Sequence, residues 1–255
     1  PQVVVAELSA PDCANNETSW NTTLFDAIMR DFYVAVCGPD AARGECKLSV
    51  AQQLSTMPSW MYVDGTDPSY LKGTDPWQCR SCKCGEYMDG NTLRDPTCRE
   101  MVRYIARLVG WYTAGGMTDE CGNRHESGLF YKWEALSVLN EDEHHMLPEG
   151  GVQYTVCFDA WRDEVRKVNP DLVLMGPEIS GGGVNPDGLA YNLYFLDGAN
   201  HADGTPPALV SNHVGLNGFP GAYDNFFSVT DQWIANVATP LLAAGKTLAP
   251  KAEYV

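Results

Sequence analysis

The stretch FYKWEALSVLNEDEHH, Phe130 to His145, decides the fold expected for this chain. It opens with apolar residues, as is typical of a strand buried on both faces of a parallel sheet. These residues are Phe130, Tyr131, Trp133, Ala135, Leu136, Val138 and Leu139. From Asn140 onward the side chains are amide, carboxylate and imidazole groups. The change marks a strand leaving the core, and α/β barrels carry their active sites at the carboxyl ends of their strands. We therefore expect the functional site at this strand end.

The bulk composition indicates one domain that covers residues 1–255. The hydrophobic content is 44%, and no apolar run approaches the length of about 18 residues that a membrane span needs. The formal net charge of −16 argues against nucleic acid and anionic membrane surfaces as partners, because phosphate binding depends on clustered Lys and Arg.

The cysteine content points to the secretory route. Nine cysteines, together with Asn-x-Thr glycosylation motifs at Asn16 and Asn21, predict a secreted or cell-surface glycoprotein with disulfide bonds. Disulfides are expected, rather than zinc, at the closely spaced Cys79, Cys82, Cys84 and Cys98. Further candidates are Cys13, Cys37, Cys46 and Cys121. Nine is an odd number, so one thiol, for which Cys157 is the candidate, is expected to be free or to pair outside this stretch.

Strand and helix patterns alternate along the chain, which favours an α/β fold with a parallel sheet. Beside the opening stretch, the expected strands are Pro1–Leu8, Leu48–Met61 with its exit loop, Leu172–Met175 before a polar exit at Gly176-Pro177-Glu178, Ala208–Leu216, and one that begins at Lys251. The expected helices are Leu24–Val36, Thr97–Trp111, Tyr154–Val168, Leu189–Leu196 and Phe226–Ala244. Ser9–Thr23 is predicted to be an exposed loop, 63–98 a Cys-rich insertion and 181–183 a flexible loop.

Four segments carry a resemblance to a known family. They are LSTMPSWMY at Leu54–Tyr62, LNEDEHH at Leu139–His145, the passage Tyr154–Glu178 with its VNPDLVLMGPE, and NHADGTPPALVSNH at Asn200–His213. In order and spacing, the chain resembles the clan A glycoside hydrolases, specifically family 39 and its xylosidase and iduronidase type. The resemblance implies a (β/α)8 TIM barrel.

The resemblance also implies a chemistry. It assigns Glu141 as the acid/base of a retaining hydrolase that cleaves a β-linked glycan by double displacement, and Asn140 as the ligand of a sugar hydroxyl. A glycosidic oxygen leaves poorly unless it is protonated, so a positioned carboxylic acid makes chemical sense here. A glycan or glycoside is then the substrate, and no cofactor is expected.

The family's strand order implies that the barrel is incomplete in this chain. With Glu141 closing the fourth strand, Glu178 closes the fifth and His213 the sixth. The first and last strands are then missing, and the nucleophilic Glu is expected just beyond Val255. Because an open parallel arc leaves its edges unpaired, we expect the remainder of the barrel, or neighbouring subunits of an extracellular assembly, as partners.

Several further residues are candidates for the substrate groove. Trp60 is predicted to stack on a sugar, as an alternative to filling the core. His213 is predicted to line the pocket, as an alternative to a buried structural histidine. Glu178 and His144 are candidates for substrate contact, as alternatives to a loop carboxylate and to structural hydrogen bonding. Adjacent side chains of an extended segment point to opposite faces, so His144 and His145 are not expected to chelate a metal.

A second function from a different class stays open. A catalytically inactive barrel module could bind carbohydrate or build an extracellular glycoprotein assembly. The Cys-rich insertion and the two glycosylation motifs favour this alternative, and a fold never fixes an activity.

Overall fold

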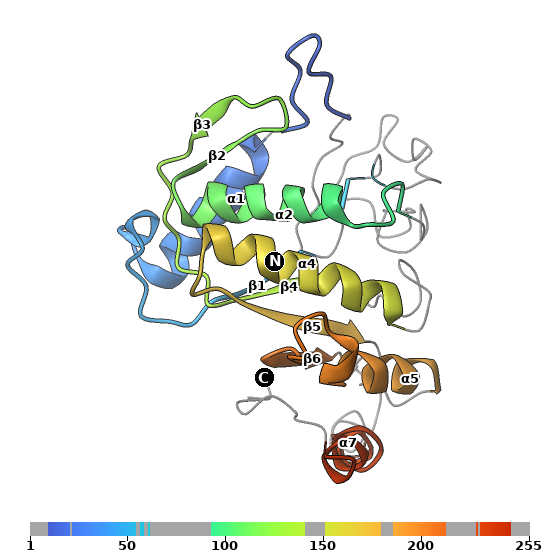
Figure 1. Ribbon diagram of the computed structural model, residues 1–255. Helices are drawn as coiled ribbons and strands as arrows, with labels where there is room; N and C mark the ends of the chain where they lie inside the picture. Colours follow the sequence, from blue (N-terminus) through green and yellow to red (C-terminus); the bar gives the residue numbers. More distant parts are fainter. Residues whose placement is uncertain are drawn as a thin grey trace, which may run out of the picture.

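The computed structural model describes residues 10–20, 22–54, 57–58, 61, 93–140, 151–179, 186–212, 228 and 230–245 (Figure 1). Several predicted features lie outside these residues: the strands at 1–8 and from 251, the loop at 181–183, and most of the insertion at 63–98.

The centre of the structure is a four-stranded parallel sheet. Its strands are β1 (Ala51–Leu54), β4 (Ala135–Val138), β5 (Val173–Ile179) and β6 (Leu209–Asn212), and they lie in the order β1-β4-β5-β6. Each strand of this sheet therefore pairs with the sheet strand that follows it along the chain, and the segment between the two forms the crossover connection. The predicted parallel α/β arrangement is confirmed for these strands, whereas closure of the sheet into a barrel stays a prediction.

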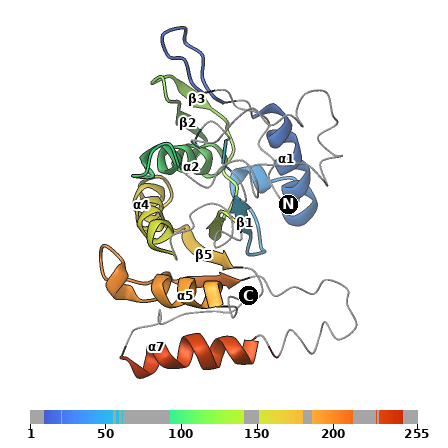
Figure 2. The ribbon, with the colours of Figure 1, turned by 90° about the vertical axis from the view of Figure 1, so that its right-hand side faces the viewer.

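Three helices form the crossovers of the sheet: α2 (Arg99–Thr113), α4 (Val152–Val168) and α5 (Pro186–Phe195). Helices α2 and α4 lie side by side in both views (Figures 1 and 2). The apolar stripe predicted for the first of them is buried, at Met101, Val102, Ile105, Leu108 and Val109. This spacing places the five side chains on one helical face, and their burial explains why the segment is helical.

Helix α1 (Thr23–Cys37) packs beside α2 through a polar contact. Asp26 of α1 accepts hydrogen bonds from Trp111 Nε1 at 2.9 Å and from the Tyr112 hydroxyl at 2.7 Å. The helix ends at Gly38, whose φ of 95° suits glycine and whose N–H donates to the Val34 carbonyl. The predicted helix at Leu24–Val36 and its stop are confirmed.

The strand predicted across Phe130–Leu139 is shorter than expected. The N–H of Phe130 donates to the Ala42 carbonyl of the 3-10 turn η1 (Ala41–Arg43), and that of Tyr131 donates to Tyr112 at the end of α2. The ladder begins at Glu134, whose N–H donates to Val50. The predicted strand start was wrong because this backbone bonds to a turn and a helix end, which leaves Phe130 exposed.

The opposite correction applies to the next strand. Gly176-Pro177-Glu178 was predicted to be a strand exit, but β5 continues through it to Ile179. Pairing with β6 extends this far, with a shift of register between Pro177 and Ile179. Glu178, with a φ of 57°, is the extra residue at this irregularity.

The antiparallel hairpin of β2 (Gly116–Thr118) and β3 (Arg124–Glu126) was not predicted. β2 begins at Gly116, directly after the end of α2 at Thr113 and the two residues that follow it. The strands have three residues each and no apolar alternation, so the sequence gives little signal for them. A Cβ on Gly116 would lie 2.2 Å from the His125 carbonyl oxygen, so close pairing requires glycine here.

The last predicted helix, Phe226–Ala244, contains a π-helical segment. Residues 230–233 are helical, η6 (Ile234–Ala238) is π-helical, and α7 (Thr239–Ala243) follows. Pro240 has no N–H, and its ring would collide with the carbonyl four residues earlier in a regular α-helix. The wider turn before Pro240 relieves this conflict.

Three disulfides connect these elements. They join Cys13 to Cys121, Cys37 to Cys46 and Cys98 to Cys157. The suggestion that Cys157 is a free thiol was wrong, because α4 places it against Cys98 at the start of α2. Cys98 therefore does not belong to a closed group with Cys79, Cys82 and Cys84, which lie outside the described residues.

Candidate functional site

Of the residues predicted for the substrate groove, the structure describes Asn140 and Glu178. Glu141, Trp60, His144 and His213 lie outside the described residues, as does the glycosylation candidate Asn21. The candidate site is therefore built from the strand ends that precede these residues.

The strand register brings Asn140 and Glu178 to the same edge of the sheet. Leu54 is level with Val138, and Ser137 is level with Met175. Asn140 thus follows the end of β4 by two residues, and Glu178 lies at the corresponding height on β5. Carboxyl ends of neighbouring parallel strands are the edge at which α/β proteins bind ligands.

The Asn140 side chain is oriented by the neighbouring strand. Its residue is 4% exposed, and its Oδ1 accepts a hydrogen bond from Gln53 Nε2 of β1 at 2.9 Å. Leu139, with a φ of 68°, turns the chain at the strand end while its N–H donates to the Leu54 carbonyl. Because Gln53 of β1 donates to Oδ1, this bond fixes which way the oxygen and the nitrogen of the Asn140 amide point.

Glu178 is a buried carboxyl group at an irregular position. The residue is 6% exposed and has a positive φ of 57°, which is uncommon for a residue other than glycine. A bulge re-aims a side chain relative to regular alternation. The predicted polar residue is therefore at the strand end, within the sheet rather than in a loop.

The two faces of the sheet differ in chemistry. On the helix-covered face, Gln52 donates to the Tyr33 hydroxyl of α1 at 3.2 Å, and Leu136 and Leu174 share its level. On the opposite face, Gln53 is level with Ser137 and Met175. This second face carries the polar side chains of Gln53 and Ser137 beside the apolar Met175, and Gln53 connects it to Asn140.

Two hydroxyl groups on this second face need partners. Within the described part of the chain, the hydroxyls of Ser137 and Ser211 are buried and accept or donate no hydrogen bond. Ser137 is 0% exposed. Buried polar groups are nearly always hydrogen-bonded, to protein, water or ligand. Further polar groups packed against this face of the sheet would satisfy both hydroxyls.

Sequence reasoning missed Gln53 and Ser137. The signal was available for both: Gln53 alternates with Gln52 in a predicted strand, and Ser137 interrupts an apolar run. Their alternation places them on the face opposite the helices.

A second polar cluster organises the β2–β3 turn. Asp119 accepts hydrogen bonds from the backbone N–H groups of Cys121 and Asn123, and its Oδ2 lies 2.8 Å from His125 Nε2. Burial would raise the pKa of Asp119, but the bonds from His125, Asn123 and Cys121 prevail and lower it to about 2. These hydrogen bonds of the Asp119 carboxylate hold the turn together, so we assign it a structural role.

A third polar cluster is largely buried. His201 Nδ1 lies 2.7 Å from Asp159 Oδ1, and its Nε2 lies 2.6 Å from the Phe195 carbonyl. Arg162 contacts the same Asp159 at 3.1 Å. Both ring nitrogens of His201 are thus engaged, which leaves neither for a ligand, and the cluster serves to fasten residues 198–205 to α4.

The residues described above contain no group of three or more His, Cys, Asp or Glu side chains arranged to hold a metal ion. Among the helices that the structure describes, none is long and apolar enough to cross a membrane. No protein-family model matches this chain, and no curated protein matches it either.

Proposed function

We propose that this chain contributes to a secreted retaining glycoside hydrolase of the barrel class that acts on a β-linked glycan. Glu141 is the acid/base in this proposal: it protonates the leaving glycosidic oxygen and later activates water. Asn140 binds a sugar hydroxyl beside the reacting carbon. The proposal rests on the sequence resemblance and on the geometry of the strand ends.

One observation carries the proposal furthest. Asn140 and Glu178 lie at the same edge of neighbouring parallel strands, and Gln53 orients the Asn140 amide. A sugar hydroxyl is recognised by side-chain amides and carboxylates held in fixed directions, because an ordered group loses little entropy on binding. The three disulfides support the secreted setting, since such bonds persist in oxidising compartments.

The test is a panel of fluorogenic xylosides, glucosides, galactosides and glucuronides with the native protein. Glu141→Gln is expected to lower kcat by about 10²- to 10⁴-fold, as loss of a general acid does. Glu143→Gln, a matched change two residues away, should leave kcat unchanged. Absence of turnover on every glycoside would overturn the proposal.

Leaving-group dependence separates the role of Glu141 from simple damage. A dinitrophenolate leaving group needs little protonation, so Glu141→Gln should slow bond cleavage less for dinitrophenyl glycosides than for methylumbelliferyl glycosides. Equal loss on both substrates would count against an acid/base role.

A non-catalytic carbohydrate-binding module is the second candidate. The three disulfides and the glycosylation motifs at Asn16 and Asn21 favour it, since both are typical of extracellular glycoprotein modules. Saturable glycan binding by the native protein, weakened by Asn140→Ala and accompanied by no turnover, would support this candidate over the hydrolase.

A further inference from the structure

The segment that precedes α1 forms a closed turn over the β2–β3 hairpin. Asp12 and Glu17 exchange backbone hydrogen bonds, with N···O distances of 2.8 and 2.9 Å, and so close residues 13–16 into a loop. Asp12 Oδ1 also accepts the N–H of Ala14. At the end of the loop, Asn16 is exposed and has a φ of 57°.

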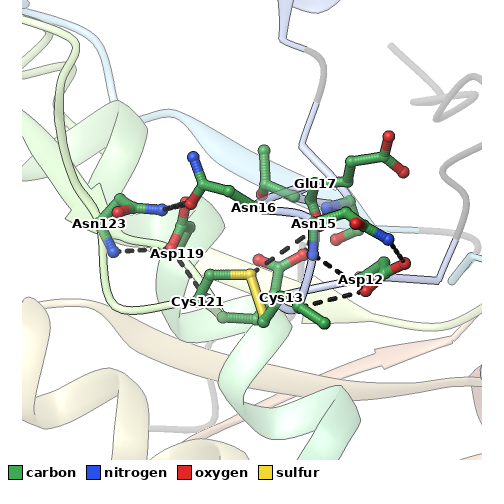
Figure 3. Close-up of a disulfide and its surroundings, with 12 residues drawn as sticks. Asp12, Cys13, Asn15, Asn16, Glu17, Asp119, Cys121 and Asn123 are labelled. Atoms are coloured by element: carbon green, nitrogen blue, oxygen red, sulfur yellow. Dashed lines mark hydrogen bonds between the residues drawn. A yellow bond between two sulfur atoms is a disulfide. The ribbon is translucent and has the colours of Figure 1, made fainter.

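Two contacts fix this turn to the hairpin. Cys13 is bonded to Cys121, and Asn123 Nδ2 donates to Asn16 Oδ1 at 2.9 Å (Figure 3). Asn123 is itself held by Asp119, which accepts from its backbone N–H at 2.8 Å and from its Nδ2 at 3.2 Å. The donor that meets Asn16 is therefore preorganised.

This arrangement uses one atom of the Asn16 amide and spares the other. The oxygen Oδ1 accepts the hydrogen bond from Asn123, whereas an N-linked sugar attaches to the nitrogen Nδ2. Asn16 begins the motif Asn16-Glu17-Thr18, and its neighbours Asn15 and Glu17 are exposed. A glycan on Nδ2 leaves the carbonyl intact, so the contact with Asn123 persists in the modified protein.

We propose that Asn16 carries an N-linked glycan and that the glycan is attached before the Cys13–Cys121 bond closes. The donor is a lipid-linked pyrophosphoryl oligosaccharide. The bond between Nδ2 and the sugar C1 forms while the bond from C1 to the pyrophosphate oxygen breaks; the amide loses one proton, and the lipid pyrophosphate leaves with the electron pair.

The order follows from what the closed turn engages. A transferase must reach the amide of Asn16 and the hydroxyl of Thr18 together. In the folded chain the Asn16 oxygen is bonded to Asn123, and Thr18 Oγ1, half-buried, accepts the N–H of Trp20 at 3.3 Å. Trp20, two residues after Thr18, stacks on Tyr104 of α2 with ring centroids 4.7 Å apart. This contact fixes the chain at the C-terminal end of the motif. In the closed chain these contacts fix the Asn16 side chain and the Thr18 hydroxyl in place, whereas the open chain lets both turn toward the transferase.

The site is tested by expressing the chain in a eukaryotic secretory host with Asn21→Gln, which removes the second motif. Total protein, folded and unfolded, is treated with peptide N-glycosidase in ¹⁸O water. The mass of the peptide that contains residue 16 is then measured by mass spectrometry. Conversion of Asn16 to labelled Asp is expected. Thr18→Ala should abolish it, and Asn15→Gln, an adjacent amide outside the motif, should leave it unchanged. An unmodified Asn16 in the Asn21→Gln chain overturns the site.

The order is tested separately, with unglycosylated chain and transferase in vitro. The reduced, unfolded chain should accept the oligosaccharide at Asn16, and the oxidised, folded chain should not. A Cys13→Ser/Cys121→Ser chain in the cell should be occupied at least as fully as its parent. Equal modification of the oxidised and reduced chains overturns the order, as does lower occupancy of the double variant.

Discussion

Gln53 donates a hydrogen bond to Asn140 across 2.9 Å and so joins the ends of β1 and β4. If Asn140 binds a sugar hydroxyl, its amide must keep one orientation, and Gln53 → Leu removes the group that sets it. We expect kcat/KM on the best fluorogenic glycoside to fall roughly tenfold, the equivalent of about one hydrogen bond. Gln53→Glu, which keeps the size but removes the donor, should behave alike.

The adjacent Gln52 offers a matched control. Its side chain points to the helices and donates to the Tyr33 hydroxyl. Gln52→Leu should therefore reduce the free energy of unfolding by about 0.5–1.5 kcal/mol, the net contribution of one hydrogen bond, because the Tyr33 hydroxyl keeps its bond to the Lys132 carbonyl, and it should leave activity per folded molecule unchanged. If the two variants lose the same activity, the positioning role of Gln53 is wrong.

The Asp119 carboxylate should contribute stability that disappears in acid. Its pKa in the folded chain is about 2, below the ordinary 3.8, so folding favours the ionised form. This contribution is complete above about pH 5 and is lost as the pH falls from there through about 2. Urea unfolding of the parent and Asp119→Asn between pH 2 and 5 should show a stability difference that shrinks on acidification. A constant difference would contradict the prediction.

The Cys98–Cys157 bond should stabilise the chain more than the Cys37–Cys46 bond does. The first closes a loop with a sequence separation of 59 and the second one of 9, and a longer loop restricts the unfolded chain more. Cys98→Ala/Cys157→Ala is expected to cost about 4 kcal/mol, and Cys37→Ala/Cys46→Ala about 2 to 3 kcal/mol. Thermal unfolding of both double variants measures the order, and a reversed order would refute the argument.

Loss of Asp159 should be among the most damaging single changes in the described chain. Its carboxylate contacts both His201 and Arg162, whose side chains are 0% and 7% exposed. Asp159→Ala leaves them without this partner and is expected to cost about 3–5 kcal/mol.

Asp203→Ala is the control for this cluster. Asp203 contacts the same Arg162 at 2.8 Å, but its own side chain is 48% exposed. An exposed partner contributes about 0–1 kcal/mol, so this variant should unfold at nearly the parent's urea concentration. Similar losses in both variants would show that burial does not govern the cluster.

Helical periodicity made α1, α2 and α4 predictable, because each buries a stripe of apolar residues that recurs every three or four positions. The parallel order of the sheet followed from the alternation of strands and helices. The position of Asn140 at a strand end was predictable because the change from apolar to polar side chains occurs between two adjacent residues, Leu139 and Asn140.

The features that were missed depend on groups far apart in the sequence. Gln53 meets Asn140 across 87 residues, and Cys98 meets Cys157 across 59. The sequence around either residue of such a pair does not indicate its partner. The β2–β3 hairpin was missed because its stability comes from the Asp119 turn and from glycine at the crossing point, rather than from any apolar alternation.

The bond between Cys13 and Cys121 spans 108 residues and ties the segment before α1 to the hairpin after α2. A protease that nicks the backbone once between Cys46 and Cys98 would therefore yield two pieces that still migrate as a single species on a non-reducing gel. Dithiothreitol would release them. Cleavage within this interval is thus invisible to size alone, and the molecule can tolerate a broken backbone without losing either half.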